Sequence, residues 1–151
     1  MSGSDRTDAT MKNILKIIIS AIIFLAMPFM ADAYMSKGKA IRVLAIGNSF
    51  SCDAVEEHLY ELSKAAGNEI TIGNAFIGGC TLATHYNCAT TNKASYQYSK
   101  RRADGTKSIK SGVSLESVLL DEDWDIITFQ QQSGLSGIYD SWKCHLPLLL
   151  S

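Results

Sequence analysis

Three short apolar segments constrain the fold of this chain more than any other feature. Residues 41–46, 69–77 and 126–130 are rich in isoleucine and other apolar side chains, and glycine or polar residues follow each segment at once. Such segments are typical of buried strands that lead into a turn. Parallel strands need crossover connections, and a helical pattern lies between the first two segments. We therefore expect an α/β sandwich with a parallel sheet.

The segments around these strands predict two helices. Residues 53–66 place Val55, Leu59 and Leu62 at helical spacing, and a glycine follows as a stop. Ser114 is a candidate cap for a short helix over residues 115–121.

The polar stretch over residues 81–100 lacks a clean period and predicts loop with some helix. Its last part, residues 96–100, alternates and can pair with residues 106–109 across the turn at residues 103–105. A small hairpin at the edge of the domain is therefore expected.

The N-terminal part has the pattern of a secretory signal peptide. Lys12 and Lys16 precede an apolar run over residues 17–29, and an Ala-x-Ala site follows at residues 31–33. The run is shorter than the roughly 20 residues of a spanning helix. We expect residues 1–33 to be an extension and signal peptide, and residues 34–151 to be one exported domain, periplasmic or extracellular, without stable membrane insertion.

Charge and cysteine content exclude several classes of protein. The formal net charge of −1 gives no reason to expect a nucleic-acid partner. The four cysteines, which could pair in an oxidising compartment, lack the spacing of a zinc site. They are Cys52, Cys80, Cys88 and Cys144. We expect no metal and no cofactor, and the sequence leaves disulfide pairing and oligomeric state open.

Ser49 is the candidate nucleophile. It follows the first apolar segment in Gly47-Asn48-Ser49 and precedes the first predicted helix, so its hydroxyl would leave the sheet on a tight turn. Its own backbone amide could stabilise an oxyanion. A serine before a helix is more often a cap, but Gly78-Gly79 ends the next strand and offers a second amide.

These segments together resemble the SGNH/GDSL hydrolase superfamily, within a family of exported bacterial proteins. The resemblance rests on residues 41–51, on Ile77 to Leu82, and on the segment Trp124 to Ser133. It implies a flavodoxin-like three-layer α/β/α sandwich, incomplete at its C-terminal end.

The resemblance also implies roles for individual residues. It assigns the nucleophile to Ser49 and an oxyanion amide to Gly79, with Gly78 as the close competitor. The superfamily's asparagine is absent after the third strand, so Gln131 or Gln132 would replace it.

The general base is missing from this pattern. The superfamily takes it from an Asp-x-x-His segment near the C-terminus, and His58, His85 and His145 all lack that spacing. The chain ends in an apolar run where the family would continue, so we expect little hydrolysis by this chain alone.

The expected substrate is a small-molecule or glycan ester, such as a carbohydrate O-acetyl ester. The alternative is a non-catalytic glycan-binding module that uses tyrosines such as Tyr96 and Tyr98 as stacking platforms.

Overall fold

The computed structural model describes residues 40–151, and the expected signal peptide lies outside them. Within the described part, no helix is both long and apolar enough to cross a membrane. The elements in chain order are β1 (Ile41–Gly47), η1 (Cys52–Leu59), α2 (Tyr60–Ala65), β2 (Ile70–Phe76), α3 (Leu82–Thr90), β3 (Tyr96–Arg101), β4 (Lys107–Val113), α4 (Leu115–Leu119), β5 (Ile126–Phe129), α5 (Ser133–Ser136), α6 (Asp140–Lys143) and α7 (Leu146–Leu149).

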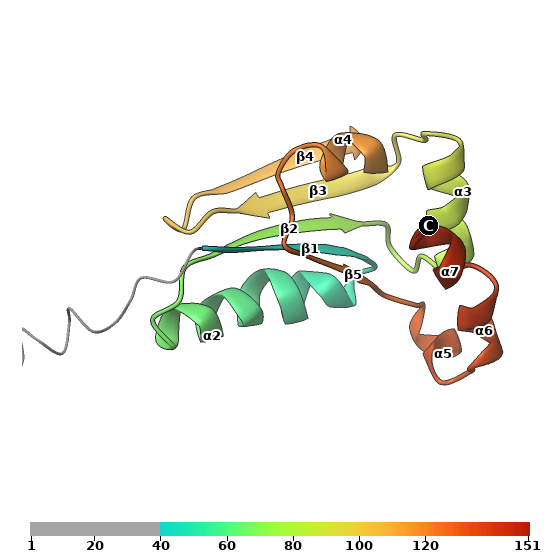
Figure 1. Cartoon of the computed structure of the whole chain (residues 1–151), viewed down its shortest axis with the longest axis horizontal. Helices are drawn as coiled ribbons and strands as arrows, with labels where there is room; N and C mark the ends of the chain where they lie inside the picture. Colours follow the sequence, from blue (N-terminus) through green and yellow to red (C-terminus); the bar gives the residue numbers. More distant parts are fainter. Residues whose placement is uncertain (1–39) are drawn as a thin grey trace, which may run out of the picture. The chain divides into compact units, whose positions relative to one another are not determined.

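One five-stranded sheet in the order β4-β3-β2-β1-β5 forms the centre of the fold (Figure 1). The three predicted strands lie side by side and parallel, with Val43 opposite both Ile72 of β2 and Ile126 of β5. The predicted hairpin of β3 and β4 is confirmed, and β4 forms the sheet edge. Strand β3 of this hairpin pairs antiparallel with β2. The expectation of a parallel sheet is therefore corrected to a mixed sheet.

Apolar side chains pack on both faces of the sheet. On one face Leu44 and Ile46 pack with Leu115 and Val118 of α4. On the other, Val43 belongs to a cluster that includes residues of η1 and α2. The period of two along β1 separates these two sets, so helices cover both faces, as Figure 1 shows for α2 and α4.

The first helix buries only part of the predicted apolar face, because Val55 and Leu59 pack against the core and Leu62 does not. Its first turns, η1, are π-helical, and α2 continues them. Glu56 and Tyr60 are buried, whereas Leu62 is 68% exposed. The wider turns of η1 change the positions that face the sheet, so the expectation for Leu62 was wrong.

Helices α3 and α4 begin at side-chain caps. The Ser114 hydroxyl accepts from Ser117 N, as predicted for α4. Helix α3 is regular where only loop with some helix was expected, and the Thr81 hydroxyl accepts from Thr84 N at its start. Leu82, His85 and Cys88 form its buried face. Because two of these three are not strongly hydrophobic, the helical period was not apparent.

Charged side chains connect the hairpin to the elements on either side. Arg101 of β3 lies 3.8 Å above the Tyr60 ring and pairs with Glu57 and Glu61. Lys107 of β4 pairs with the buried Glu56. The hairpin is thereby held against the helical segment η1–α2.

His85 gives the stability of the fold a pH dependence. Its Nδ1 lies 2.9 Å from the Tyr96 hydroxyl, the two rings stack, and burial lowers the pKa of His85 from 6.5 to about 4. Between these pH values the unfolded chain binds a proton that the native chain does not. The part of the stability that depends on neutral His85 is therefore fully present above pH 6.5, and it is lost as the pH falls towards 4.

We expect the free energy of unfolding to fall by up to about 3 kcal/mol across this interval because of His85. Urea denaturation at a series of pH values measures this change in the free energy of unfolding. His85→Gln cannot titrate there, so its stability should change less with pH than that of the unsubstituted chain. Equal slopes for the two proteins would contradict this assignment.

Candidate functional site

Three loops meet at the carboxyl ends of the parallel strands. Residues 48–50 follow β1, residues 77–80 follow β2, and residues 130–132 follow β5. Because β1 lies between β2 and β5, these loops are neighbours at one end of the sheet. The sequence prediction that these three places form one site is therefore consistent with the sheet order.

The Asn48 side chain joins the three loops. It is 2% exposed, and its Nδ2 donates to Cys80 O at 3.5 Å and to Gln131 O at 3.2 Å. Its Oδ1 accepts from Phe50 N at 3.3 Å. One carboxamide thus holds the loops after β2 and β5 against the turn after β1.

A second amide side chain supports the same turn. Gln130 Oε1 accepts from Asn48 N at 3.1 Å, and Gln130 N donates to Ile46 O at 3.0 Å. A Cβ atom on Gly47 would lie 2.7 Å from Gln130 Oε1. Because residue 47 is a glycine, the Gln130 carboxamide has room to lie against the end of β1.

Ser49 stands exposed on the turn that Asn48 fixes. Within residues 40–151 its hydroxyl and its backbone N–H have no hydrogen-bond partner. Helical backbone begins at Phe50, directly after Ser49, but the Ser49 hydroxyl makes no capping hydrogen bond among the described residues. The Ser51 hydroxyl, in contrast, lies 2.7 Å from both Asn48 O and Asn74 Oδ1. The serine that could react and the serine that is structural are two residues apart.

Gly78 and Gly79 form a tight turn after β2. Cys80 N donates to Ile77 O at 3.1 Å, and Gly79 has φ of +62°. Ile77 N donates to Gly47 O at 3.2 Å, so hydrogen bonds to residues 47 and 48 hold both ends of the turn. In the described part of the chain the N–H groups of both glycines have no acceptor, and both residues are exposed.

The two candidate glutamines have different environments. The Gln131 carboxamide is buried, accepts from Leu82 N at 3.1 Å, and donates to Ser141 O at 3.0 Å and to its hydroxyl at 3.2 Å. Gln131 therefore holds α3 through its carbonyl oxygen and α6 through its amide protons. Gln132 is half-buried and its side chain lies over Gly134, without a hydrogen-bond partner among the described residues.

No histidine of the described chain contacts Ser49. His58 is exposed on η1, and His85 is buried against Tyr96 in the core. His145 is half-buried, with its ring 5.8 Å from that of Tyr86. The structure thus places a serine and free backbone amides at one end of the sheet, and no imidazole of residues 40–151 forms a hydrogen bond with Ser49.

Tyr96 and Tyr98 are not stacking platforms. They are 0% and 4% exposed, and both belong to the core under α4. The suggestion that they hold a glycan was wrong, because their alternation along β3 turns both rings towards the core face of the sheet.

The loops after β1 and β5 border a pocket of about 320 Å³. Its lining includes Phe50, Gln130, Ser133, Ser136 and Trp142. Trp142 Nε1 donates to Ser136 O at 3.0 Å, which fixes the position of the indole. The residue after Ser49 therefore contributes an aromatic ring to a space large enough for a small acyl or sugar group.

The four thiols are free and none belongs to a metal site within the described residues. Burial, together with the nearby Cys88, raises the pKa of Cys80 to about 11. Burial and the Glu56 carboxylate also raise the pKa of Cys52. These cysteines are protonated at neutral pH, which disfavours them as nucleophiles.

The fold and these loops define an α/β protein with a candidate site at the carboxyl ends of three parallel strands. The chain belongs to the family described as a domain of unknown function, DUF4886, whose model matches residues 42–151. It is similar to the crystal structure of a DUF4886 family protein from Bacteroides uniformis, with 51% identity and a TM-score of 0.71. The match covers 74% of this chain and 43% of that one. A comparison with curated proteins found no match.

The role of Asn48 can be tested by Asn48→Asp. A carboxylate there loses both donors and faces two carbonyl oxygens in a buried position. We expect the free energy of unfolding at pH 7 to fall by about 3 kcal/mol. Asn87→Asp, at an exposed position on α3, is the control and should change it by less than about 0.5 kcal/mol. Chemical denaturation compares the two, and similar effects would contradict the bridging role.

The glycine pair offers a second matched test. Gly79 has φ of +62°, whereas Gly78 has ordinary φ, and neither lacks space for a methyl group. We expect Gly79→Ala to lower the thermal stability by about 1 kcal/mol and Gly78→Ala to leave it nearly unchanged. Equal effects in calorimetry would mean that the turn does not depend on the backbone of Gly79.

Proposed function

We propose that this chain carries the nucleophile and oxyanion amides of an SGNH-type serine esterase, with Ser49 as the nucleophile. The observation that carries the proposal is the exposed, unpaired Ser49 hydroxyl beside the buried Asn48. The parallel strands β2-β1-β5 have the spatial order 2-1-3 in which a flavodoxin-like sheet begins, and this supports the sandwich expected of such enzymes.

The proposed reaction transfers an acyl group to Ser49. Its Oγ bonds to the ester carbonyl carbon, the bond to the alcohol oxygen breaks, and the serine proton passes through a base to the leaving alcohol. Water then cleaves the acyl-enzyme and releases the carboxylic acid. The N–H groups of Ser49 and Gly79 are suited to the developing oxyanion, because neither has an acceptor within residues 40–151.

Gln132 is the better candidate for a third oxyanion donor. The Gln131 amide donates to Ser141, whereas the Gln132 carboxamide has no partner among the described residues. A small rotation of the Gln132 side chain would free it from Gly134 without breaking a hydrogen bond.

The substrate class follows from the pocket and from export. The pocket beside Phe50 and Trp142 suits a small acyl group or one sugar ring, and the signal-peptide pattern at residues 1–33 directs the domain to the periplasm or the outside. A carbohydrate O-acetyl ester has a small acyl group and a sugar ring, so it is the substrate class that we propose.

The general base of this reaction is not among the histidines described above. Because His58, His85 and His145 do not contact Ser49, the chain by itself should hydrolyse esters slowly. The resemblance places the base in an Asp-x-x-His segment, and the solved relative extends well beyond its match to this chain.

Ser49→Ala tests the proposal in an extended chain. The extended chain joins residues 1–151 to the part of the Bacteroides uniformis protein that lies outside the match. We expect it to hydrolyse p-nitrophenyl acetate, and Ser49→Ala to lower kcat/KM at least about 1,000-fold. Ser111→Ala, an exposed serine on β4, is the control and should retain the rate within about twofold.

A fluorophosphonate probe followed by peptide mass analysis locates the reactive serine in the same protein. Labelling of Ser49 supports the assignment. Hydrolysis that persists in Ser49→Ala, or labelling of another serine, would overturn it.

A further inference from the structure

A buried amide side chain interrupts one apolar face of β2. Asn74 is 0% exposed, and it shares a face of the sheet with Ile70 and Ile72, because side chains alternate along a strand. That face packs against η1 and α2. An amide among apolar side chains costs free energy unless its polar atoms are hydrogen-bonded. The partners of Asn74 therefore indicate what its amide does there.

Asn74 lies between a carboxylate and a hydroxyl. Its Nδ2 donates to Glu56 Oε2 at 3.0 Å, and its Oδ1 lies 2.7 Å from the Ser51 hydroxyl. Glu56 and Ser51 are both buried. Because a carboxylate only accepts hydrogen bonds, the NH₂ group of Asn74 must face Glu56, and its carbonyl oxygen then faces Ser51. The charge of Glu56 thus sets the orientation of the Asn74 amide.

The Ser51 hydroxyl connects Asn74 to the turn that carries Ser49. Ser51 Oγ lies 2.7 Å from Asn48 O as well as from Asn74 Oδ1. Ser51 N donates to Asn48 O at 3.0 Å, and Cys52 N donates to Ser49 O at 3.2 Å. These two backbone hydrogen bonds close the turn. The Ser51 side chain therefore connects the closed turn to the middle of β2.

The other end of this arrangement lies on the edge hairpin. Glu56 pairs with Lys107 of β4. Burial alone would raise the pKa of Glu56, but hydrogen bonds from Lys107 and Asn74 outweigh it and lower this pKa below its ordinary value of 4.5. Glu56 is therefore a carboxylate at neutral pH. We call Lys107, Glu56, Asn74 and Ser51 the polar network.

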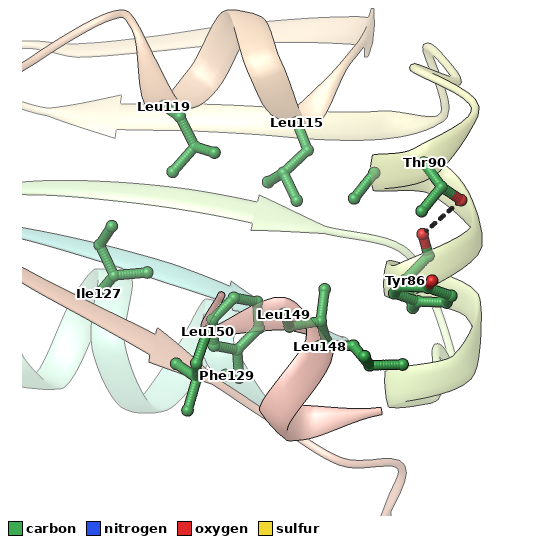
Figure 2. Close-up of a pocket in the computed structure, with 10 residues that line it drawn as sticks. Tyr86, Thr90, Leu115, Leu119, Ile127, Phe129, Leu148, Leu149 and Leu150 are labelled. Carbon is green, nitrogen blue, oxygen red and sulfur yellow. Dashed lines mark hydrogen bonds between the residues drawn. The ribbon is translucent and has the colours of Figure 1, made fainter. Parts of the chain in front are cut away.

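The opposite face of the sheet is apolar near the same strands. A groove of about 480 Å³ lies there between α3, α4, β5 and α7 (Figure 2). Figure 2 shows that Leu115 and Leu119 of α4 and the side chains of β5 border this space. No residue of the polar network lines it. Helix α4 can therefore serve as a reference that is remote from the polar network.

From these contacts we infer that Glu56 is a positioning residue for the turn that carries Ser49, and that it acts through Asn74 and Ser51. Within residues 40–151 the Ser49 hydroxyl has no hydrogen-bond partner, so the polar network acts on the backbone of the turn. The π-helical turns of η1, which are rare and frequent at functional sites, contain Glu56. Only the catalytic consequence of this role rests on the proposed function.

Glu56→Gln in the 151-residue chain tests the role of the charge. A glutamine carboxamide has nearly the same size, but it both donates and accepts, so it no longer fixes the orientation of Asn74. Lys107 keeps Glu57 as a partner at 2.9 Å. The substitution thus leaves no unpaired lysine, and the chain should still fold.

Hydrogen exchange of two amides measures the closure of the turn. We expect the amides of Ser51 and Cys52 to exchange at least about fivefold faster in Glu56→Gln. The amides of α4 should change by less than about twofold, because they report the stability of the opposite face. Glu57→Gln is the matched control: it also removes a carboxylate next to Lys107, and it should change the two amides by less than about twofold.

The same substitution in a Ser51→Ala background separates positioning from general stabilisation. Ser51→Ala interrupts the polar network between Asn74 and Asn48 O. Glu56→Gln should then change the exchange of the Cys52 amide by less than about twofold, because coupled residues are not additive. A fivefold effect in both backgrounds, a similar effect of the control substitution, or equal acceleration in α4 would overturn the inference.

Fluorophosphonate labelling of Ser49 in these variants tests the catalytic consequence separately. Under the proposed function we expect Glu56→Gln to slow the labelling at least about fivefold, and Glu57→Gln to leave it within about twofold. The expected exchange pattern without labelling in any variant would contradict the proposed function and still support the positioning role. Unchanged exchange in Glu56→Gln would overturn that role whatever the labelling rate.

Discussion

The carboxamide of Asn48 is the interaction on which the candidate site depends. The loops after three parallel strands meet here, and the carbonyl groups of Cys80 and Gln131 accept from Asn48 in a buried place. Asn48 supplies two donors and one acceptor at this point. Because Ser49 is the next residue, the hydrogen bonds that hold the loops together also fix the backbone from which its hydroxyl projects.

The sheet could be predicted from the sequence where side-chain hydrophobicity alone determines burial. The isoleucine-rich segments became β1, β2 and β5, and the alternation at residues 96–100 with its glycine turn became β3 and β4. The direction of β3 beside β2 could not be predicted, because it depends on how α3 reverses the chain. Helix α3 itself was hidden because its buried face contains His85 and Cys88.

The sequence could predict those residues of the candidate site that lie directly after a strand. Ser49 and Gly79 occupy the turns after two parallel strands, and their positions need no knowledge of distant contacts. The roles of the glutamines could not be foreseen. Gln130 supports Asn48 from 82 positions away, and Gln131 holds Ser141, so their side-chain partners are set by tertiary structure alone. Three adjacent glutamines gave no signal that would separate these functions.

The two edges of the sheet differ in chemistry, and this difference limits how copies of the chain can associate. Strand addition needs an accessible edge, and lysines on an edge oppose it. The exposed Lys110 of β4 acts in this way, whereas Ile126 and Ile127 of β5 are apolar. Two sheets can therefore join through their β5 edges, but the resulting pair has a lysine-bearing strand at each outer end. Edge-to-edge association then closes at two copies and does not propagate into a fibre.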